Sequence, residues 1–207
     1  RWMGPVALEP AIEIVSVHGS SESEDAWGRI YGWTPGATAR ELLVRHGPRG
    51  FLGSGDGHDG HPGLAHLAGG SGGLTGVWTD ARDRAGLAAA LRARRTFATN
   101  GPRFLLRMRV GDAESGGEVA PGDTVVEARV VASRRVERVE LVRVSASESR
   151  TGVVEQRFPT ASVTREVFEA VSLEPGEMVY VRARLEDGGF GIASPVVATE
   201  RPGSAVQ

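Results

Sequence analysis

The chain has 207 residues and a formal net charge of −2, which gives no electrostatic reason to expect a nucleic acid or an anionic membrane as a partner. It contains no cysteine, which excludes disulfides and thiolate metal sites and leaves His, Asp and Glu as metal ligands. No apolar run reaches membrane-spanning length and no signal peptide is recognisable, so we expect a soluble chain of undetermined compartment.

The first hundred residues alternate strand and helix patterns. Short apolar runs predict strands at residues 11–17, 51–54 and 73–78, and helical spacing predicts helices at 38–46 and 80–95, the second with Asp80 as its N-cap. Alternating strands and helices favour a parallel α/β layer, so we expect an α/β domain over residues 1–102.

The sequence pattern changes after Gly101. From there on, apolar and polar residues alternate with a period of two in short runs, which turn residues separate. These runs predict strands at residues 104–110, 125–132, 138–144, 163–170 and 178–185. We therefore expect an antiparallel, immunoglobulin-like β-sandwich over residues 103–200, followed by a disordered tail at 201–207. In the last of these strands the alternation predicts apolar side chains inside and polar ones, such as Arg182, outside.

The densest set of metal-ligand side chains follows the predicted strand at 51–54. Asp56 and His58 are two residues apart, and on an extended backbone both point to the same side. His18 follows the predicted strand at 11–17, and in a parallel sheet both loops reach the same rim. The sequence thus predicts a metal site there, with a glycine-rich surface loop, in which Asp and His only form turns, as the alternative.

Other candidates around this site have open alternatives. Glu22 is a fourth ligand, a partner that orients His18, or a charge near a helix N-terminus. His61, like His66, shares the glycine-rich loop and contacts either substrate or only water. Arg95 belongs to a basic cluster that suits phosphate recognition, although a solvated helix end explains that cluster as well. Glu13, if buried in its strand, needs a partner and is either half of an ion pair or a site carboxylate.

Three stretches in order carry a resemblance to a known family: PAIEIVSVHGSSE at residues 10–22, GFLGSGDGH at 50–58 and ALRARRTFATNG at 90–101. The chain resembles the polymerase and histidinol phosphatase (PHP) superfamily of metal-dependent phosphoesterases. The likeness is to a branch in which a β-sandwich follows the barrel.

This resemblance implies that residues 1–102 are the C-terminal portion of a distorted (β/α)₇ barrel. It implies a site for two or three divalent metal ions (Zn, Mn, Fe or Mg), where a metal-bound hydroxide hydrolyses a small-molecule phosphoester. Asp56 and His58 match metal ligands of the superfamily, and His18 and Glu22 match a motif at the site face.

The opening H-x-H motif of the superfamily and its upstream ligands would precede Arg1. We therefore expect a C-terminal fragment that is inactive without the missing N-terminal half of the barrel as its partner. The alternative function is a non-catalytic β-sandwich module for binding, carried on a structural α/β remnant.

Overall fold

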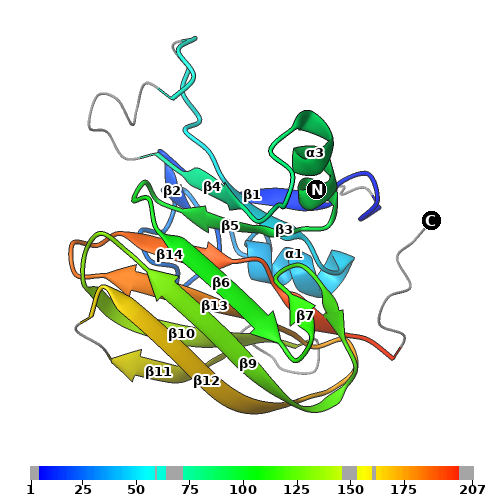
Figure 1. Cartoon of the computed structure of the whole chain (residues 1–207). Coiled ribbons are helices and arrows are strands. Elements are labelled where there is room, and N and C mark those ends of the chain that lie inside the picture. The colour runs from blue at the N-terminus through cyan, green and yellow to red at the C-terminus, as the bar shows by residue number, and fades with distance from the viewer. Residues whose placement is uncertain (1–4, 59, 64–71, 146–152, 160–161, 201–207) are drawn as a thin grey trace.

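The computed structural model describes residues 5–58, 60–63, 72–145, 153–159 and 162–200. Strands hold far more of these residues than helices do, so the described part of the chain is built mainly of β-structure (Figure 1). In chain order the elements are β1 (Ala11–Ser16), β2 (Gly19–Ser20), α1 (Ala39–His46), β3 (Gly50–Gly53), β4 (Leu74–Val77), α3 (Arg84–Arg92), β5 (Thr96–Thr99), β6 (Leu105–Val110), β7 (Ala113–Glu114), β8 (Glu118–Val119), β9 (Gly122–Val131), β10 (Val136–Val144), β11 (Val153–Pro159), β12 (Thr164–Leu173), β13 (Met178–Leu185), β14 (Phe190–Ala193) and β15 (Val196–Ala198).

The smallest sheet carries the N-terminal part of the chain. Strand β1 pairs with β3 in parallel, with Ala11 beside Gly50, and pairs with β2 in antiparallel fashion. Helix α1 lies between β2 and β3 in the chain and begins at a capping box, in which Thr38 and Glu41 each accept a hydrogen bond from the other's amide. This exchange satisfies two amides that the first helical turn leaves without intrahelical partners. The strands and the helix predicted at 11–17, 38–46 and 51–54 are confirmed.

The largest sheet joins both halves of the chain. Its order is β11-β10-β13-β14-β5-β4, and off this path β15 pairs with β13 and β8 pairs with β15. Strand β5 pairs with β14, where Ala98 lies opposite Ile192, and β4 pairs with β5 in antiparallel fashion. The sheet therefore continues across residue 102, where we expected one domain to end and the next to begin.

A four-stranded sheet, in the order β12-β9-β6-β7, faces the large sheet and completes a sandwich (Figure 1). Its strands alternate: in β6, Leu106 and Met108 are buried, whereas Leu105 and Arg107 are exposed. The buried side chains join those of β10 and β13 in one core. One apolar face per strand is what a sheet that covers a core from one side requires. The five strands predicted after residue 102 are confirmed as β6, β9, β10, β12 and β13.

The predicted fold class is wrong, because the first half does not contain part of a (β/α)₇ barrel. Within the described part of residues 1–102, β1 and β3 are the only parallel pair, and β4 and β5 run antiparallel. The sheets of the described residues do not close on themselves, and only two helices, α1 and α3, occur in them. Local periodicity indicates whether a segment is a helix or a strand, but not which segment it packs beside. The predicted elements were therefore correct, while their arrangement as a parallel α/β layer was not.

The exposed face predicted for strand β13 is also wrong. Tyr180 and Arg182, on the face that we expected to meet water, are both buried. The segment around Glu22 and the start of α1 lie on this face, and Arg40 donates a hydrogen bond to the Tyr180 hydroxyl. Strand β13 is thus a central strand with both faces covered, which alternation alone does not distinguish from a half-exposed one.

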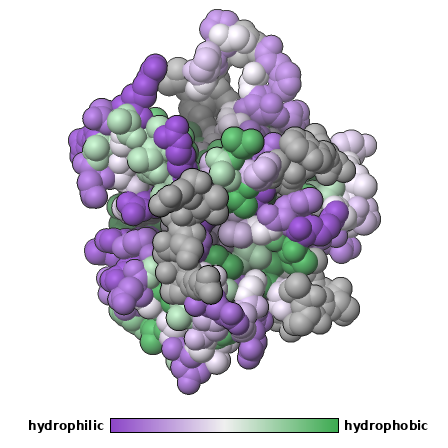
Figure 2. Space-filling model, turned by 90° about the vertical axis from the view of Figure 1, so that its right-hand side faces the viewer, coloured by the Kyte–Doolittle hydropathy of each residue, from purple (hydrophilic) through white to green (hydrophobic). Residues whose placement is uncertain are grey.

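Helix α3 begins later than its sequence pattern suggests. Its N-cap is Asp83 rather than Asp80, and the Asp83 carboxylate accepts from the Gly86 amide at 2.7 Å. Neither helix in the described residues is long and apolar enough to cross a membrane. On the face in Figure 2, hydrophobic areas are small and bordered by hydrophilic residues. His66 and the tail predicted at 201–207 lie outside the described residues.

Candidate metal centre

Two loops meet at one end of the small sheet. His18 lies in the turn between β1 and β2, and Asp56 and His58 lie in the loop that follows β3. Because β1 and β3 are adjacent and parallel, their carboxyl ends reach the same rim. The parallel pairing that the sequence predicted is therefore what brings these loops together.

Close backbone packing fixes the start of the second loop. The Ser54 amide donates to the Val15 carbonyl at 2.9 Å, which ties the loop to the end of β1. The Thr75 hydroxyl donates to the Gly53 carbonyl at 2.7 Å and accepts from the Gly53 amide at 3.0 Å. Gly73 allows this approach, because a Cβ there would lie 2.3 Å from the Val15 oxygen. The loop therefore leaves the sheet from a rigid base.

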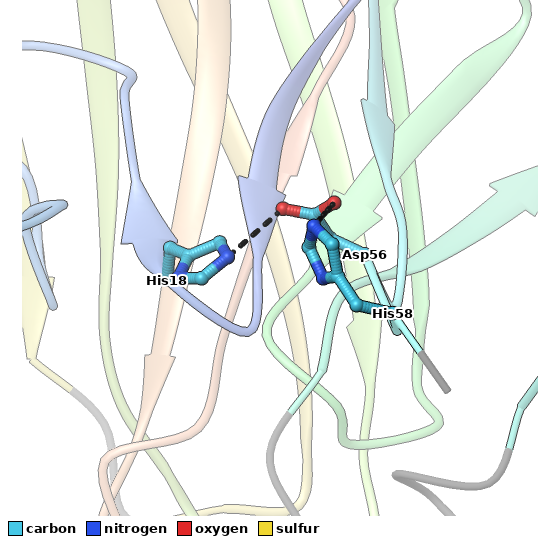
Figure 3. A group of neighbouring side chains, drawn as sticks. All are labelled: His18, Asp56 and His58. Atoms are coloured by element: carbon cyan, nitrogen blue, oxygen red, sulfur yellow. Dashed lines mark ion pairs between the residues drawn. The ribbon is translucent and has the colours of Figure 1, made fainter. Parts of the chain in front are cut away.

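Asp56 adopts a backbone conformation that side chains rarely take. Its φ is +45°, in the left-handed region, which costs a non-glycine residue about 1 to 2 kcal/mol. Asp is among the few residue types that tolerate this region, and strained residues of this kind concentrate at functional sites. The bend directs the Asp56 carboxylate toward the turn that carries His18 (Figure 3).

The three side chains converge with the carboxylate between the two imidazoles (Figure 3). One Asp56 oxygen lies 3.2 Å from His18 Nε2, and the other lies 4.0 Å from His58 Nε2. The rings of His18 and His58 meet edge to face, with centroids 6.0 Å apart. One ligand atom from each residue lies within 4.8 Å of the other two. In the described part of the chain, no other group of three such residues has this geometry.

This set of donors suits a borderline divalent ion. Two imidazole nitrogens and one carboxylate oxygen are ligands for Zn, Mn or Fe, and three protein ligands are typical of catalytic zinc sites, which keep one position open. Two ligands bound at about 2.1 Å to a tetrahedral ion lie about 3.4 Å apart. The measured 3.2 and 4.0 Å are close to that spacing. The side chains of His18, Asp56 and His58 are 56%, 39% and 77% exposed, so they have room to adjust and the site is open to solvent.

Glu22 does not join this group. It is completely buried, and its carboxylate accepts from the Tyr180 hydroxyl, from Arg40 at 2.8 Å and from Arg182 at 3.0 Å. Burial opposes ionisation, but the charges of Arg40 and Arg182 outweigh it and hold the pKa of Glu22 below its ordinary value. The expectation that Glu22 binds metal is corrected by this placement, because its lone pairs are already used inside the protein.

The buried network around Glu22 is the feature that the sequence did not predict. Arg182 also donates to Glu140 at 2.7 Å, so two buried carboxylates face two buried guanidiniums. Trp27 lies 4.5 Å from the Arg182 guanidinium, in cation–π geometry. The only sequence signal is the alternation of Arg182 and Arg184 with apolar residues in this strand, and that pattern equally predicts an exposed face.

The other candidates lie outside the group. Glu13 is exposed rather than buried, and its carboxylate accepts from the Ser54 hydroxyl at 2.6 Å. His61 is exposed on the same loop as Asp56. Arg95 is exposed and lines a groove of about 730 Å³ between the end of α3 and residues 112–118, a groove that none of the three ligand residues lines. The proposed substrate contacts of His61 and Arg95 stay predictions.

A family model described as "Protein of unknown function (DUF3604)" matches residues 47–132. The match covers less than half of the chain; it includes Asp56 and His58 but not His18. No curated protein matches the chain.

Proposed function

We propose that His18, Asp56 and His58 hold a divalent metal ion and form part of the metal centre of a phosphoesterase. The observation that carries this proposal is the convergence of three ligand atoms within 4.8 Å, from two loops that the parallel pair β1 and β3 positions. The phosphoester substrate rests on the resemblance of residues 50–58 to the metal-ligand motif of the PHP superfamily.

Each residue has a distinct part in this centre. His18 and His58 supply neutral nitrogen lone pairs through Nε2, and the Asp56 carboxylate supplies the negative charge that offsets part of the ion's charge. Held by these three residues, a divalent ion would polarise a phosphoryl oxygen and make water a stronger nucleophile at neutral pH. The exposure of all three side chains leaves room for a small phosphoester to reach the ion.

The open geometry also limits the activity that we expect. Three exposed ligands are the minimum for a catalytic site, whereas the superfamily resemblance implies two or three ions with more ligands. We therefore expect the 207-residue chain to bind one ion and to hydrolyse a phosphoester slowly or not at all.

Isothermal titration with Mn²⁺ and Zn²⁺ tests the proposal. We expect one site per chain, and Asp56→Gly removes it, because the carboxylate is lost. Since φ at Asp56 is +45°, glycine relieves backbone strain at that position, so this variant keeps the stability of the wild type within about 1 kcal/mol. A matched control is Asp80→Gly, which removes an exposed carboxylate outside the group. Equal metal affinity in the wild type and Asp56→Gly contradicts the proposal.

A further inference from the structure

We infer that Tyr180 and Arg182 of strand β13 position His18 for the metal ion through the buried carboxylate of Glu22. The inference rests on the proposed function, and it gives the sandwich a part in the metal centre. Tyr180, Arg182 and Glu22 are positioning residues in this account, since none of them touches the ion.

The first step is the short chain between His18 and Glu22. Strand β2 carries Gly19 and Ser20, and the turn that holds His18 closes between Ser16 and Gly19. His18 is more than half exposed, and its amide donates to the Ser16 hydroxyl at 3.1 Å. The position of His18 is therefore set by the position of β2, and Glu22 lies two residues beyond the end of β2.

The second step is how firmly Glu22 is held. Its carboxylate receives the Tyr180 hydroxyl and the guanidiniums of Arg40 and Arg182. The backbone carbonyl of Glu22 accepts a hydrogen bond from the Arg40 amide at 3.0 Å. Helix α1 and strand β13 therefore both hold Glu22 in place. Hydrogen bonds between charged groups in a buried site are strong and directional, which fixes the carboxylate in one place.

The third step is that β13 is a central, buried strand of the core. Tyr180 and Arg182 are buried in a strand that pairs with β10 along its whole length. The Tyr180 ring also meets the ring of Phe51, on β3, edge to face at 5.3 Å. Strand β13 thus contacts both segments that carry the metal ligands. It contacts β3, which precedes Asp56 in the chain, and Glu22, which follows His18.

The variant Tyr180→Phe tests the inference because it removes one hydroxyl and leaves the ring and every charge in place. We expect its dissociation constant for Mn²⁺ to rise about threefold to tenfold. Removing a residue that hydrogen-bonds a metal ligand directly lowers metal affinity about 10- to 100-fold, and Tyr180 acts on His18 from further away. We also expect a changed Co²⁺ absorption spectrum, because this spectrum reports the geometry of the ligands.

The variant Val130→Ala distinguishes a purely structural effect from a positioning role. Val130 is buried in β9, which pairs with β6 and β12 and not with the strands that carry the metal ligands. The substitution lowers stability but is expected to leave the Mn²⁺ affinity and the Co²⁺ spectrum unchanged. Should Tyr180→Phe not fold, Arg40→Lys takes its place, since it keeps the charge and removes the forked contact to Glu22 and Tyr180.

Wild-type affinity and spectrum in Tyr180→Phe, in a chain that binds Mn²⁺, overturn the inference and leave the proposed function standing. A wild-type chain that binds no ion overturns the proposed function and the inference with it. A loss of affinity in Val130→Ala equal to that in Tyr180→Phe also overturns the inference, because affinity then follows stability alone.

Discussion

Replacing Arg182 by Met should cost the chain a large part of its stability. Arg182 is buried and donates to both Glu22 and Glu140, at 3.0 and 2.7 Å. Methionine fills much of the same space but leaves two buried carboxylates with one fewer cation. Removing one partner of a buried ion pair costs about 3 to 5 kcal/mol in the free energy of unfolding. For a chain of this size that lowers Tm by about 6 to 20 °C.

The pH dependence of this loss gives a sharper signature. The pKa of Glu22 in the folded protein is below its ordinary value of 4.5, so its stabilising contribution is complete above pH 4.5 and disappears as the pH falls through the lower folded value. In Arg182→Met the same carboxylate is still buried but has lost one of its two guanidiniums. The stability difference between wild type and variant should therefore shrink as the pH falls below about 5.

Urea denaturation of both proteins between pH 4 and pH 7 measures this difference directly. Adding Glu140→Gln to Arg182→Met removes the one excess negative charge that Arg182→Met leaves in the network, and it should recover part of the loss. A loss below about 1 kcal/mol at pH 7, or a difference that grows on acidification, refutes the account of this network as a set of mutually dependent charges.

Two further changes test local parts of the account. Gly73→Ala places a Cβ 2.3 Å from the Val15 oxygen, so it should cost about 3 kcal/mol and weaken Mn²⁺ binding, whereas Gly55→Ala, with open space around its Cβ, should change neither; equal effects in denaturation and titration contradict the packing argument. Thr38→Ala removes the side-chain half of the capping box and should lower the free energy of unfolding by about 1 kcal/mol, measured by urea denaturation; no change would mean that Glu41 alone caps α1.

The sequence predicted most of the longer elements, but it did not predict which of them are neighbours, and it missed strands such as β5, β11 and β14. The apolar run at 73–78 indicated a strand, and β4 forms there, yet nothing in that run identifies β5 as its partner. In this pair Phe97 lies opposite Gly76, and its ring fills the place that a Cβ of Gly76 would take, so the close fit joins residues 21 apart in the chain. Contacts of this kind leave no periodic trace in either segment.

The candidate site was better anticipated than the fold around it. Asp56, His58 and His18 were chosen because each follows a predicted strand, and the parallel pairing of β1 and β3 alone suffices to bring their loops together. Glu22 was placed in the same set because it lies in the segment after the first predicted strand and matches a motif at the site face of the PHP superfamily. Its burial against Tyr180 and Arg182 depends on residues about 160 positions away, which sequence spacing does not reveal.

The most direct test of the account is to locate the ion. Crystals of the chain soaked in Mn²⁺ or Zn²⁺ should show an anomalous scattering peak about 2.0 to 2.2 Å from His18 Nε2, His58 Nε2 and an Asp56 oxygen. A saturated crystal with no peak there, or with the peak elsewhere and these three side chains unmoved, contradicts the claim that they form one metal centre.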